Sequence, residues 1–456
     1  MASPRVVIPR VWALAQIAVI LAALASIASE RMTTPSGLIC GLYLLARSMA
    51  YVAQRLTYAQ QHHSRPTFPL PPEHYAIAVL LLMAALSTAI TALPDITYPQ
   101  VLRLLIGITT CLAIREGLMS WHIPYIGLHP AAVLGLTGLG LGLALIAPIG
   151  VDWLSDKLPI PLSIYKIFPR LLGDGIHANV MAGVLTVFLP IPFSQLLFSS
   201  SARPTNFGHL RLSAKTIQFG LSMATAIIFF ILVITQSRGG LLGMAGSGIV
   251  LLFMRFRRLR IPILGATLVI ALLLILRLAL PNAGPPAVQQ FLQSLLSVRA
   301  SSSAELRYEA WQRAWYMIQD FPITGIGMGS YKVISDVMYP TFVSPESLPH
   351  AHNLFLQIAV DLGLPGLLAW LAAWVVVIRA CIILRTGSQS SPALAAGLFA
   401  SQVALGVHGL LDAPVWGQVR AAPLIWLVWG VALGLAYHQN HVIPVTPTSP
   451  TYNYSQ

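Results

Sequence analysis

Long runs of hydrophobic residues alternate with short polar segments along the chain. A membrane-spanning helix needs about 20 apolar residues to cross a hydrocarbon core about 30 Å thick. Twelve runs are candidates for such helices, at residues 11–29, 36–54, 75–93, 98–114, 127–149, 177–199, 216–236, 239–254, 261–280, 353–378, 392–411 and 421–437. The pattern predicts an all-α, polytopic integral membrane protein with about twelve transmembrane helices. We interpret the first run as an uncleaved helix, because it is longer than a signal peptide core and further spans follow.

Composition supports a membrane protein and excludes several other classes. Of the 456 residues, 56% are hydrophobic and 9% are charged, whereas soluble domains carry about 25% charged residues. A soluble enzyme and a disordered chain are therefore excluded. The net charge of +13 does not indicate nucleic-acid binding, because the charge density is low. Cys40, Cys111 and Cys381 all lie in apolar runs, so no disulfide framework is expected.

The basic residues predict the orientation, since short cytoplasmic loops carry an excess of arginine and lysine. With the N-terminus inside, the inner segments collect fourteen basic residues, and 255–260 is their clearest cluster. Both termini are then cytoplasmic, and the long outer segments are 150–176 and 281–352. We divide the chain into an N-terminal part (1–176), a core that includes the large helical outer loop (177–437), and a cytoplasmic tail (438–456).

The first candidate for chemistry on the outer side is Arg238, in the segment Thr235-Gln236-Ser237-Arg238-Gly239-Gly240. This segment joins two spans so closely that we expect a tight outer turn, with the two glycines letting the backbone reverse. Arg238 is then held near the membrane interface. It either extends toward the lipid headgroups or clamps a lipid phosphate, because a guanidinium fork matches phosphate oxygens.

The second candidate lies at 303–315, where the sequence predicts a helix along the outer surface that includes Trp311. Glu309 and Arg313 are spaced i, i+4, so we expect them to form an ion pair. Arg307 lies one turn before Trp311 and is the better candidate for an available cation. The helix could equally be only an amphipathic surface element.

A glycine-rich segment follows at 321–331, with Gly325, Gly327 and Gly329. Such a segment can bind phosphate through backbone amides, but no strand precedes it as a nucleotide-binding fold requires. We therefore favour a simple glycine turn.

The third candidate is His350-Ala351-His352-Asn353, at the entry to the tenth span. Alternate residues of a helix point about 200° apart, so both histidines would not face one ligand if the segment were helical. That argues against a paired metal site, and no further Cys/His cluster completes one. Without other information the segment could be a helix cap with an interfacial histidine. Asp361, inside the same span, is expected to face the bundle interior, because facing lipid would be costly.

Further polar groups lie at the same level of the predicted topology. They are His177-Ala178-Asn179, which opens the sixth span, and Asp412 with Arg420 in the last outer loop. Each of them, taken alone, is more typical of a helix cap or an ion pair than of a site.

Four of these motifs, in this order, resemble those of the O-antigen ligase and polymerase family of bacterial membrane glycosyltransferases. The resemblance covers roughly 180–415, and the first 150 residues share only the hydropathy pattern. The matching motifs are His177-Ala178-Asn179-Val180-Met181-Ala182, Ser237-Arg238-Gly239-Gly240, Arg307 with Trp311 upstream of Pro322-Ile323-Thr324-Gly325-Ile326-Gly327, and His352-Asn353 before Asp361-Leu362-Gly363.

The resemblance implies a transferase on the outer face of the bacterial inner membrane. It would move a glycan from undecaprenyl diphosphate to an acceptor hydroxyl, on the lipid A core or on another glycan. Arg238 and Arg307 would hold the diphosphate, His352 would be the catalytic residue on the acceptor side, and His350 is a secondary candidate. Possible supporting residues are Asn353, Asn179, Asp361, Asp412 and Arg420.

The chemistry fits the residue types independently. A sugar hydroxyl is too weakly acidic to ionise beforehand, so a base must take its proton as the bond forms, and neutral histidine suits that role. Fixed arginines can neutralise a departing diphosphate without a metal. The chain has no Asp-x-Asp triplet, and we expect neither a metal nor a cofactor. A one-step displacement would invert the anomeric carbon.

Three alternatives stay open within the family: a ligase, a polymerase, and an enzyme that glycosylates protein. The twelve spans and the single large late outer loop favour a ligase slightly. A secondary transporter is the alternative from another class, since twelve spans with both ends inside are common there. Transporters usually show matched halves and broken helices at the midplane, whereas the polar residues here gather at the outer surface.

Overall fold

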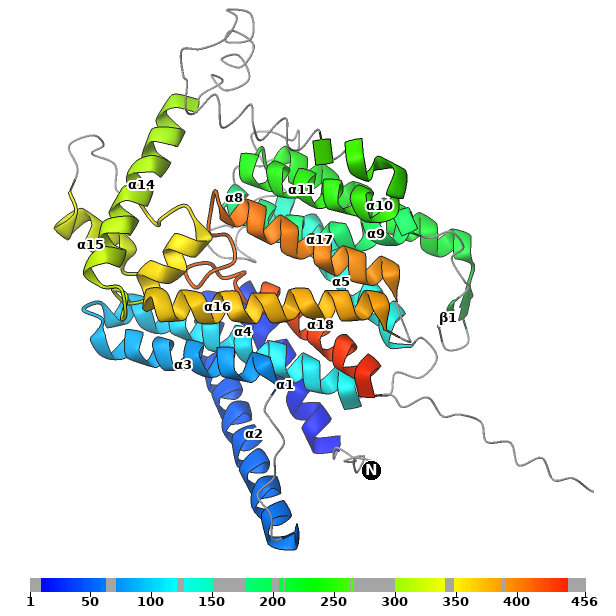
Figure 1. The fold of residues 1–456 in the computed structure, drawn as a ribbon, viewed down its shortest axis with the longest axis horizontal. Helices are drawn as coiled ribbons and strands as arrows, with labels where there is room; N and C mark the ends of the chain where they lie inside the picture. The colour runs from blue at the N-terminus through cyan, green and yellow to red at the C-terminus, as the bar shows by residue number, and fades with distance from the viewer. Residues whose placement is uncertain are drawn as a thin grey trace, which may run out of the picture.

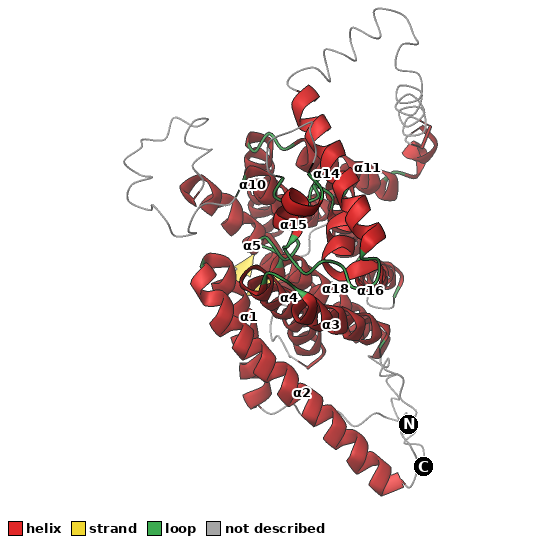
Figure 2. Ribbon diagram, turned by 90° about the vertical axis from the view of Figure 1, so that its left-hand side faces the viewer, coloured by secondary structure: helices red, strands yellow, loops and turns green. Residues whose placement is uncertain are grey.

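A computed structural model describes residues 10–62, 71–120, 127–150, 177–198, 205–207, 210–262, 264–265, 300–340, 348–387 and 391–441. These residues are helical apart from turns and one short antiparallel hairpin, β1 (Thr205–Phe207) and β2 (Leu210–Leu212) (Figure 2). The predicted all-α class is confirmed. The outer segment 151–176, most of the ninth expected span, and 442–456 lie outside the described residues.

The helices follow the apolar runs of the sequence closely. The N-terminal part contains α1 (Arg10–Ala28), η1 (Glu30–Met32), α2 (Thr33–His62), α3 (Pro72–Ile90), α4 (Pro94–Ser120) and α5 (Leu128–Gly150). The core contains α8 (Ala178–Phe188), α9 (Pro190–Phe198), α10 (Ala214–Ile234), α11 (Arg238–Arg255), η2 (Arg257–Leu259), α16 (Leu354–Thr386), α17 (Pro392–Gly409) and α18 (Pro423–His441). Between α11 and α16 lie α14 (Ala300–Asp320) and α15 (Tyr331–Met338), at one end of the bundle (Figure 1).

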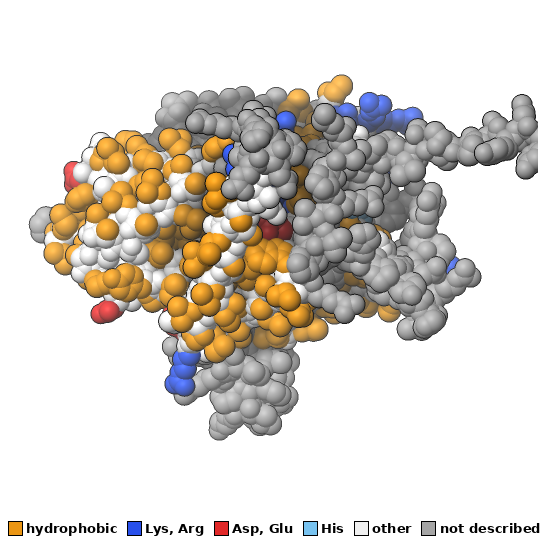
Figure 3. All heavy atoms as spheres, turned by 90° about the horizontal axis from the view of Figure 1, so that it is seen from below, with side chains coloured by type: hydrophobic (Ala, Val, Ile, Leu, Met, Phe, Trp, Pro, Cys, Tyr) orange, Lys and Arg blue, Asp and Glu red, His pale blue; other side chains and the backbone are white. Residues whose placement is uncertain are grey.

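Among the described residues, seven helical segments are long and apolar enough to cross a membrane by length and composition, so the number of twelve stays a prediction. Hydrophobic side chains cover much of the face drawn in Figure 3. On α16 the large exposed side chains lie along one stripe, at Leu364, Leu368, Val375 and Ile382, and each is more than 40% exposed. A soluble protein rarely exposes such a continuous apolar stripe, so this stripe is suited to lipid. The described helices therefore form a multi-pass membrane bundle.

Small residues bring the helices of the core close together. On α18, a Cβ at Gly430 would lie 2.7 Å from the carbonyl oxygen of Cys111 on α4, and one at Gly434 would lie 3.0 Å from that of Arg115. In lipid the hydrophobic effect does not favour contact between helices, so their association depends on close van der Waals packing. Small residues allow that close approach. The contact fixes α18 along α4. All three cysteines of the chain are buried free thiols within the bundle.

Two buried arginines of α4 pair with acidic residues. Arg115 donates to Glu73 at 2.8 Å on α3, and Arg103 pairs with Glu30 at 2.5 Å. Arg103 lies near the start of α4 and Arg115 near its end, so the pairs stabilise opposite ends of this helix. Pairing of this kind is what makes ionisable groups tolerable within a membrane bundle.

The two ends of the core differ in chemistry. At one end, Arg255 donates to the carbonyl of Leu197 at 3.0 Å, and Arg385 donates to that of Met254 at 3.4 Å. The ends of α9, α11 and α16 therefore meet there, next to the cluster 255–260. The opposite ends of α8, α11 and α16 carry the motif residues.

The glycine-rich segment 321–331 docks into a break in α16. Gly363 has φ 70°, so the helix hydrogen bonding is interrupted there. The segment replaces the missing bonds, since the amide of Ile326 donates to the carbonyl of Val360 at 2.8 Å and that of Leu364 donates to Pro322 at 2.7 Å. Gly325, Gly327 and Gly329 all have positive φ angles. This geometry is that of a structural glycine turn, as the sequence indicated.

Candidate active site

The two histidines lie in a non-helical segment, residues 348–353, that we call the histidine loop. His352 has φ 46°, a left-handed conformation that is uncommon for residues other than glycine. This turn brings His350 and His352 to the same side, with their ring centroids 4.0 Å apart. The expectation that they point apart was wrong, because it assumed a helix. The sequence argument against a shared ligand therefore fails.

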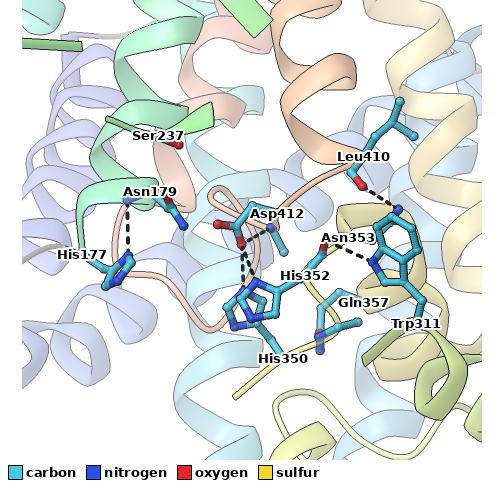
Figure 4. A network of polar contacts seen from close by, with 12 residues as sticks. His177, Asn179, Ser237, Trp311, His350, His352, Asn353, Gln357, Leu410 and Asp412 are labelled. Atoms are coloured by element: carbon cyan, nitrogen blue, oxygen red, sulfur yellow. Dashed lines mark hydrogen bonds and ion pairs between the residues drawn. The ribbon is translucent and has the colours of Figure 1, made fainter. Parts of the chain in front are cut away.

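Both rings meet the carboxylate of Asp412, which follows the end of α17 (Figure 4). Nε2 of His350 is 2.8 Å from Oδ1 of Asp412, and Nδ1 of His352 is 3.7 Å from the same oxygen. We call these three residues the histidine–aspartate cluster. The sequence indicated a helix cap or an ion pair for Asp412, and the partners of its carboxylate are the two histidine rings.

Burial and hydrogen bonding set the charges of the cluster. Burial alone would raise the pKa of Asp412, but the hydrogen bond from His350 and the nearby ring of His352 lower it below its usual range. The amide of Ala413 also donates to Oδ1 at 2.8 Å. Burial lowers the pKa of His350, although its hydrogen bond with Asp412 opposes that shift. At neutral pH the cluster therefore combines an ionised carboxylate with a neutral His350 ring.

A buried network holds the histidine loop from inside the bundle. Between the two histidines, the amide of Ala351 donates to Oε1 of Gln357 at 2.8 Å, and Nε2 of Gln357 donates to Asp361 at 3.0 Å. Asp361 also accepts hydrogen bonds from the amide of Gly329 at 3.1 Å and from Nε1 of Trp416 at 2.7 Å. Asp361 is 0% exposed, so its predicted interior position is confirmed. It connects the glycine turn, α16 and the last outer loop, and does not touch the cluster directly.

Asn353 connects the histidine loop to two helices. Its Oδ1 accepts the first-turn amides of α16, including that of Phe355 at 3.0 Å, and its Nδ2 donates to the carbonyl of Leu410 at 3.1 Å. On the other side, Nε1 of Trp311 on α14 donates to the carbonyl of His352 at 3.4 Å (Figure 4). The loop is thereby anchored to α14, α16 and the end of α17.

The turn before α11 differs from the sequence expectation. The residue with the left-handed conformation is Gln236, with φ 54°, and not a glycine. Ser237 caps α11 by accepting the amide of Gly240 at 3.3 Å. Gly239 and Gly240 lie within the first turn of the helix. They are needed for close packing, and Arg238 is exposed at the start of the helix.

Sequence analysis missed His408, a histidine near the end of α17. Its side chain is 2% exposed, and neither ring nitrogen has a hydrogen-bond partner among the described residues. Gly183 and Gly239 make room for the ring, since a Cβ at either would lie within 3 Å of it. The charges of Asp412 and Arg307 both act on this ring. His408 therefore packs between α8 and α11, and the charges of Asp412 and of Arg307 on α14 reach its ring. Its only sequence signal is one polar residue in an apolar run.

The remaining candidates lie around the same end. In α14, Arg313 pairs with Glu309 at 2.5 Å, as predicted, and also donates to Ser335 at 2.8 Å. Arg307 is half-buried, and its Nε has no hydrogen-bond partner among the described residues.

The structure confirms the interpretation of His177 as a helix cap, since its Nδ1 accepts the amide of Asn179 at 3.3 Å at the start of α8. The charge of His177 also acts on His350, so this cap lies near the cluster.

Comparison with known families locates these residues in a recognised segment. Residues 223–371 match the family model described as O-antigen ligase. We call residues 223–371, which are similar to this family, the O-antigen ligase segment. It begins within α10, ends within α16 and covers about a third of the chain. No curated protein gives a significant match to the chain.

The O-antigen ligase segment contains Arg238, Arg307 and both histidines of the cluster, while Asp412 and His408 lie beyond it. The family match confirms the resemblance seen in the motifs. Together with the apolar helices, it indicates a multi-pass bacterial membrane protein with a glycosyltransferase-type role in polysaccharide assembly.

The same cluster has the composition of a metal-binding group. One ligand atom from each of His350, His352 and Asp412 can be chosen so that all three lie within 4.8 Å of one another. Imidazole and carboxylate are ligands that zinc accepts. The cluster can thus act either as a proton acceptor with a supporting carboxylate or as a set of metal ligands.

Proposed function

We propose that the protein transfers a glycan from undecaprenyl diphosphate to an acceptor hydroxyl. The observation that carries this proposal is the histidine–aspartate cluster. Trp311, one turn after Arg307 on α14, donates to the carbonyl of His352 at 3.4 Å, and His408, four residues before Asp412, lies against Gly239 at the start of α11. A base and cations placed together in an O-antigen ligase segment are what a lipid diphosphate donor and a hydroxyl acceptor require.

His352 is the proposed general base. Its side chain is 21% exposed, so an acceptor can approach the ring. As the acceptor oxygen bonds to the anomeric carbon, its proton passes to the neutral imidazole. Asp412, 3.7 Å from Nδ1, then stabilises the imidazolium. A positioned general base contributes about 10²–10⁴-fold to a rate. His350, hydrogen-bonded to Asp412, keeps this carboxylate in place and is the secondary candidate.

Arg238 and Arg307 are proposed to hold the diphosphate. The bond between the anomeric carbon and the phosphate oxygen breaks as the new glycosidic bond forms, and the electron pair leaves with undecaprenyl diphosphate. Two guanidinium groups can bind phosphate oxygens in a bidentate manner and neutralise this charge. The N-terminus of α11 adds positive potential at the same place. Arginines then supply the charge stabilisation, so transfer needs no metal, and one displacement inverts the anomeric carbon.

The reaction is proposed to take place on the outer face of the inner membrane. The cluster and the basic segment 255–260 lie at opposite ends of the core helices, and basic segments favour the cytoplasmic side. Asn179, Asn353, Asp361 and the last outer loop with Arg420 support the site structurally. Both termini are then cytoplasmic.

The proposal favours a ligase, with the lipid A core as acceptor, over a polymerase of the same family. The test uses purified protein in vesicles with a labelled undecaprenyl-diphosphate glycan, a chelator, and one of two acceptors. Label transferred to the lipid A core identifies a ligase, whereas longer lipid-linked glycan identifies a polymerase. A donor that crosses the membrane without any new covalent bond would refute the transferase and indicate a transporter.

A further inference from the structure

The histidine–aspartate cluster combines two nitrogen ligands and one oxygen ligand that come from separate parts of the chain. His350 and His352 belong to the histidine loop, and Asp412 follows α17. We propose that this cluster also binds one divalent ion of the zinc and cobalt class, which inhibits the transferase by occupying the imidazole nitrogens. The inhibition rests on the proposed function, whereas the binding does not.

The distances are close to those of a tetrahedral site. Zinc bonds to histidine nitrogen and carboxylate oxygen are about 2.0–2.2 Å long, which places tetrahedral ligand atoms about 3.3 Å apart. In the cluster, Oδ1 of Asp412 is 2.8 Å from Nε2 of His350 and 3.7 Å from Nδ1 of His352. One contact must lengthen and the other shorten by about half an ångström. The three ligand atoms all lie within 4.8 Å of one another, so the two ring nitrogens must also close to about 3.3 Å when a metal binds.

Two ligand nitrogens are available without breaking a competing bond in the protein. Nδ1 of His352 is buried and has no hydrogen-bond partner among the described residues. Among the described hydrogen bonds, Nε2 of His350 takes part in one, with Asp412. A metal bound between Nε2 and this carboxylate therefore takes the place of the proton in that bond. This proton moves to Nδ1 of the His350 ring. On His352 the ring proton moves to Nε2 in the same way, so that Nδ1 presents its lone pair to the metal.

The groups behind the ligands are already fixed. The amide of Ala413 holds Asp412, and Gln357 holds the backbone between the two histidines. Outer contacts of this kind orient metal ligands and typically contribute about 10–100-fold to metal affinity. Asn353 anchors the end of the loop to Leu410, so Asp412 and the histidines are attached to the same pair of helices.

The ligand types select the metal. Zinc and cobalt(II) accept imidazole readily, whereas magnesium and calcium need six or more ligands that are mostly oxygen. The cluster offers a single carboxylate, so magnesium should not compete. Three protein ligands leave the fourth position to water, as in many zinc sites. When the metal holds the lone pairs of Nε2 of His350 and Nδ1 of His352, the other nitrogen of each ring carries a proton. Neither histidine can then accept the proton of an acceptor hydroxyl.

Binding is tested with tag-free protein in detergent and with Co²⁺ alone as the probe, in the absence of glycan. We expect one Co²⁺ per chain with the visible absorption of a tetrahedral site, displaced by Zn²⁺ and unaffected by Mg²⁺. His352→Ala, His350→Gln and Asp412→Asn should each weaken binding at least about tenfold. His129→Ala is the matched control, because His129 lies at the start of α5, far along the chain from the cluster, and it should bind as the wild type does.

Inhibition is tested in the transfer assay with increasing Zn²⁺. Activity should fall over the same concentrations at which Zn²⁺ displaces Co²⁺, and a chelator should restore it. Cobalt binding that survives in the three cluster variants, or is lost in His129→Ala, would overturn the site. Activity that is unchanged or raised at saturating Zn²⁺ would overturn the inhibition. A protein that lacks transferase activity but binds Co²⁺ through the cluster would contradict the proposed function alone.

Discussion

The contact between Gly239 and His408 links the α11 motif to the cluster, and Gly239→Ala tests it. A Cβ at position 239 would lie 2.6 Å from Cδ2 of His408 and 3.0 Å from its Nε2, whereas ordinary contacts begin near 3.4 Å. The ring and α11 must therefore separate by about 0.8 Å. His408 cannot simply turn away, because its other edge lies against Gly183 and its side chain is 2% exposed.

The expected cost follows from this separation. Overpacking a well-packed core costs about 1–3 kcal/mol, while replacing a glycine in a helix with alanine gains about 0.5–1 kcal/mol. We expect a net loss of about 1–2 kcal/mol in the free energy of unfolding. The carbonyl of His408 accepts the amide of Asp412 at 3.0 Å, so the shift reaches the cluster. A misplacement of about 1 Å can lower a catalytic rate about 100-fold.

The assay compares Gly239→Ala with Gly248→Ala in the same helix, where a Cβ would meet nothing within 4 Å. Transfer rate and thermal unfolding are measured in the same detergent. We expect Gly239→Ala to lose both activity and stability and Gly248→Ala to keep both. The double variant Gly239→Ala/His408→Ala should lose less unfolding free energy than the two single variants lose in sum, because the shortened side chain at 408 removes the clash. Equal behaviour of the two glycine variants, or strict additivity in the double variant, would refute the contact.

Three further predictions concern the cations, the carboxylate and the break in α16. Arg307→Lys keeps the charge but loses the bidentate fork, so the KM for the donor should rise about tenfold. The control Arg313→Lys should lower thermal stability and leave this KM unchanged. The reverse pattern would contradict the assignment. Asp412→Asn should lower kcat about 10²–10⁴-fold without unfolding the protein, which transfer rates and circular dichroism will check. Gly363→Ala places a Cβ 2.2 Å from the carbonyl oxygen of Ile323 at a left-handed position; we expect a loss of more than about 2 kcal/mol in stability, and an unchanged melting temperature would argue against the docked glycine turn.

Hydropathy predicted the positions of the described helices well, because bilayer thickness sets the length of an apolar run directly, although seven of the twelve expected spans are long and apolar enough among the described residues. The interior position of Asp361 was predictable for the same reason, since a carboxylate facing lipid is costly. The pairing of Glu309 with Arg313 followed from helical spacing alone. Each of these inferences uses only local sequence and the solvent around it.

The convergence of the two histidines could not be predicted in this way. It depends on the left-handed backbone at His352, which tertiary contacts from Gln357 and Trp311 maintain. The importance of His408 is likewise non-local, because its neighbours Gly183 and Gly239 come from α8 and α11. Gly239 has its role for the same reason, since its close partner lies on a helix distant in the sequence.

The role of His352 as the base is tested most directly by separating donor binding from transfer in His352→Ala. Purified variant and wild type are given labelled undecaprenyl-diphosphate glycan in vesicles, and bound donor and transferred glycan are measured in parallel, with His129→Ala as the control. The proposal predicts unchanged donor binding and a fall in transfer of about 10²–10⁴-fold for His352→Ala, with wild-type behaviour in the control. Full transfer by His352→Ala would contradict it.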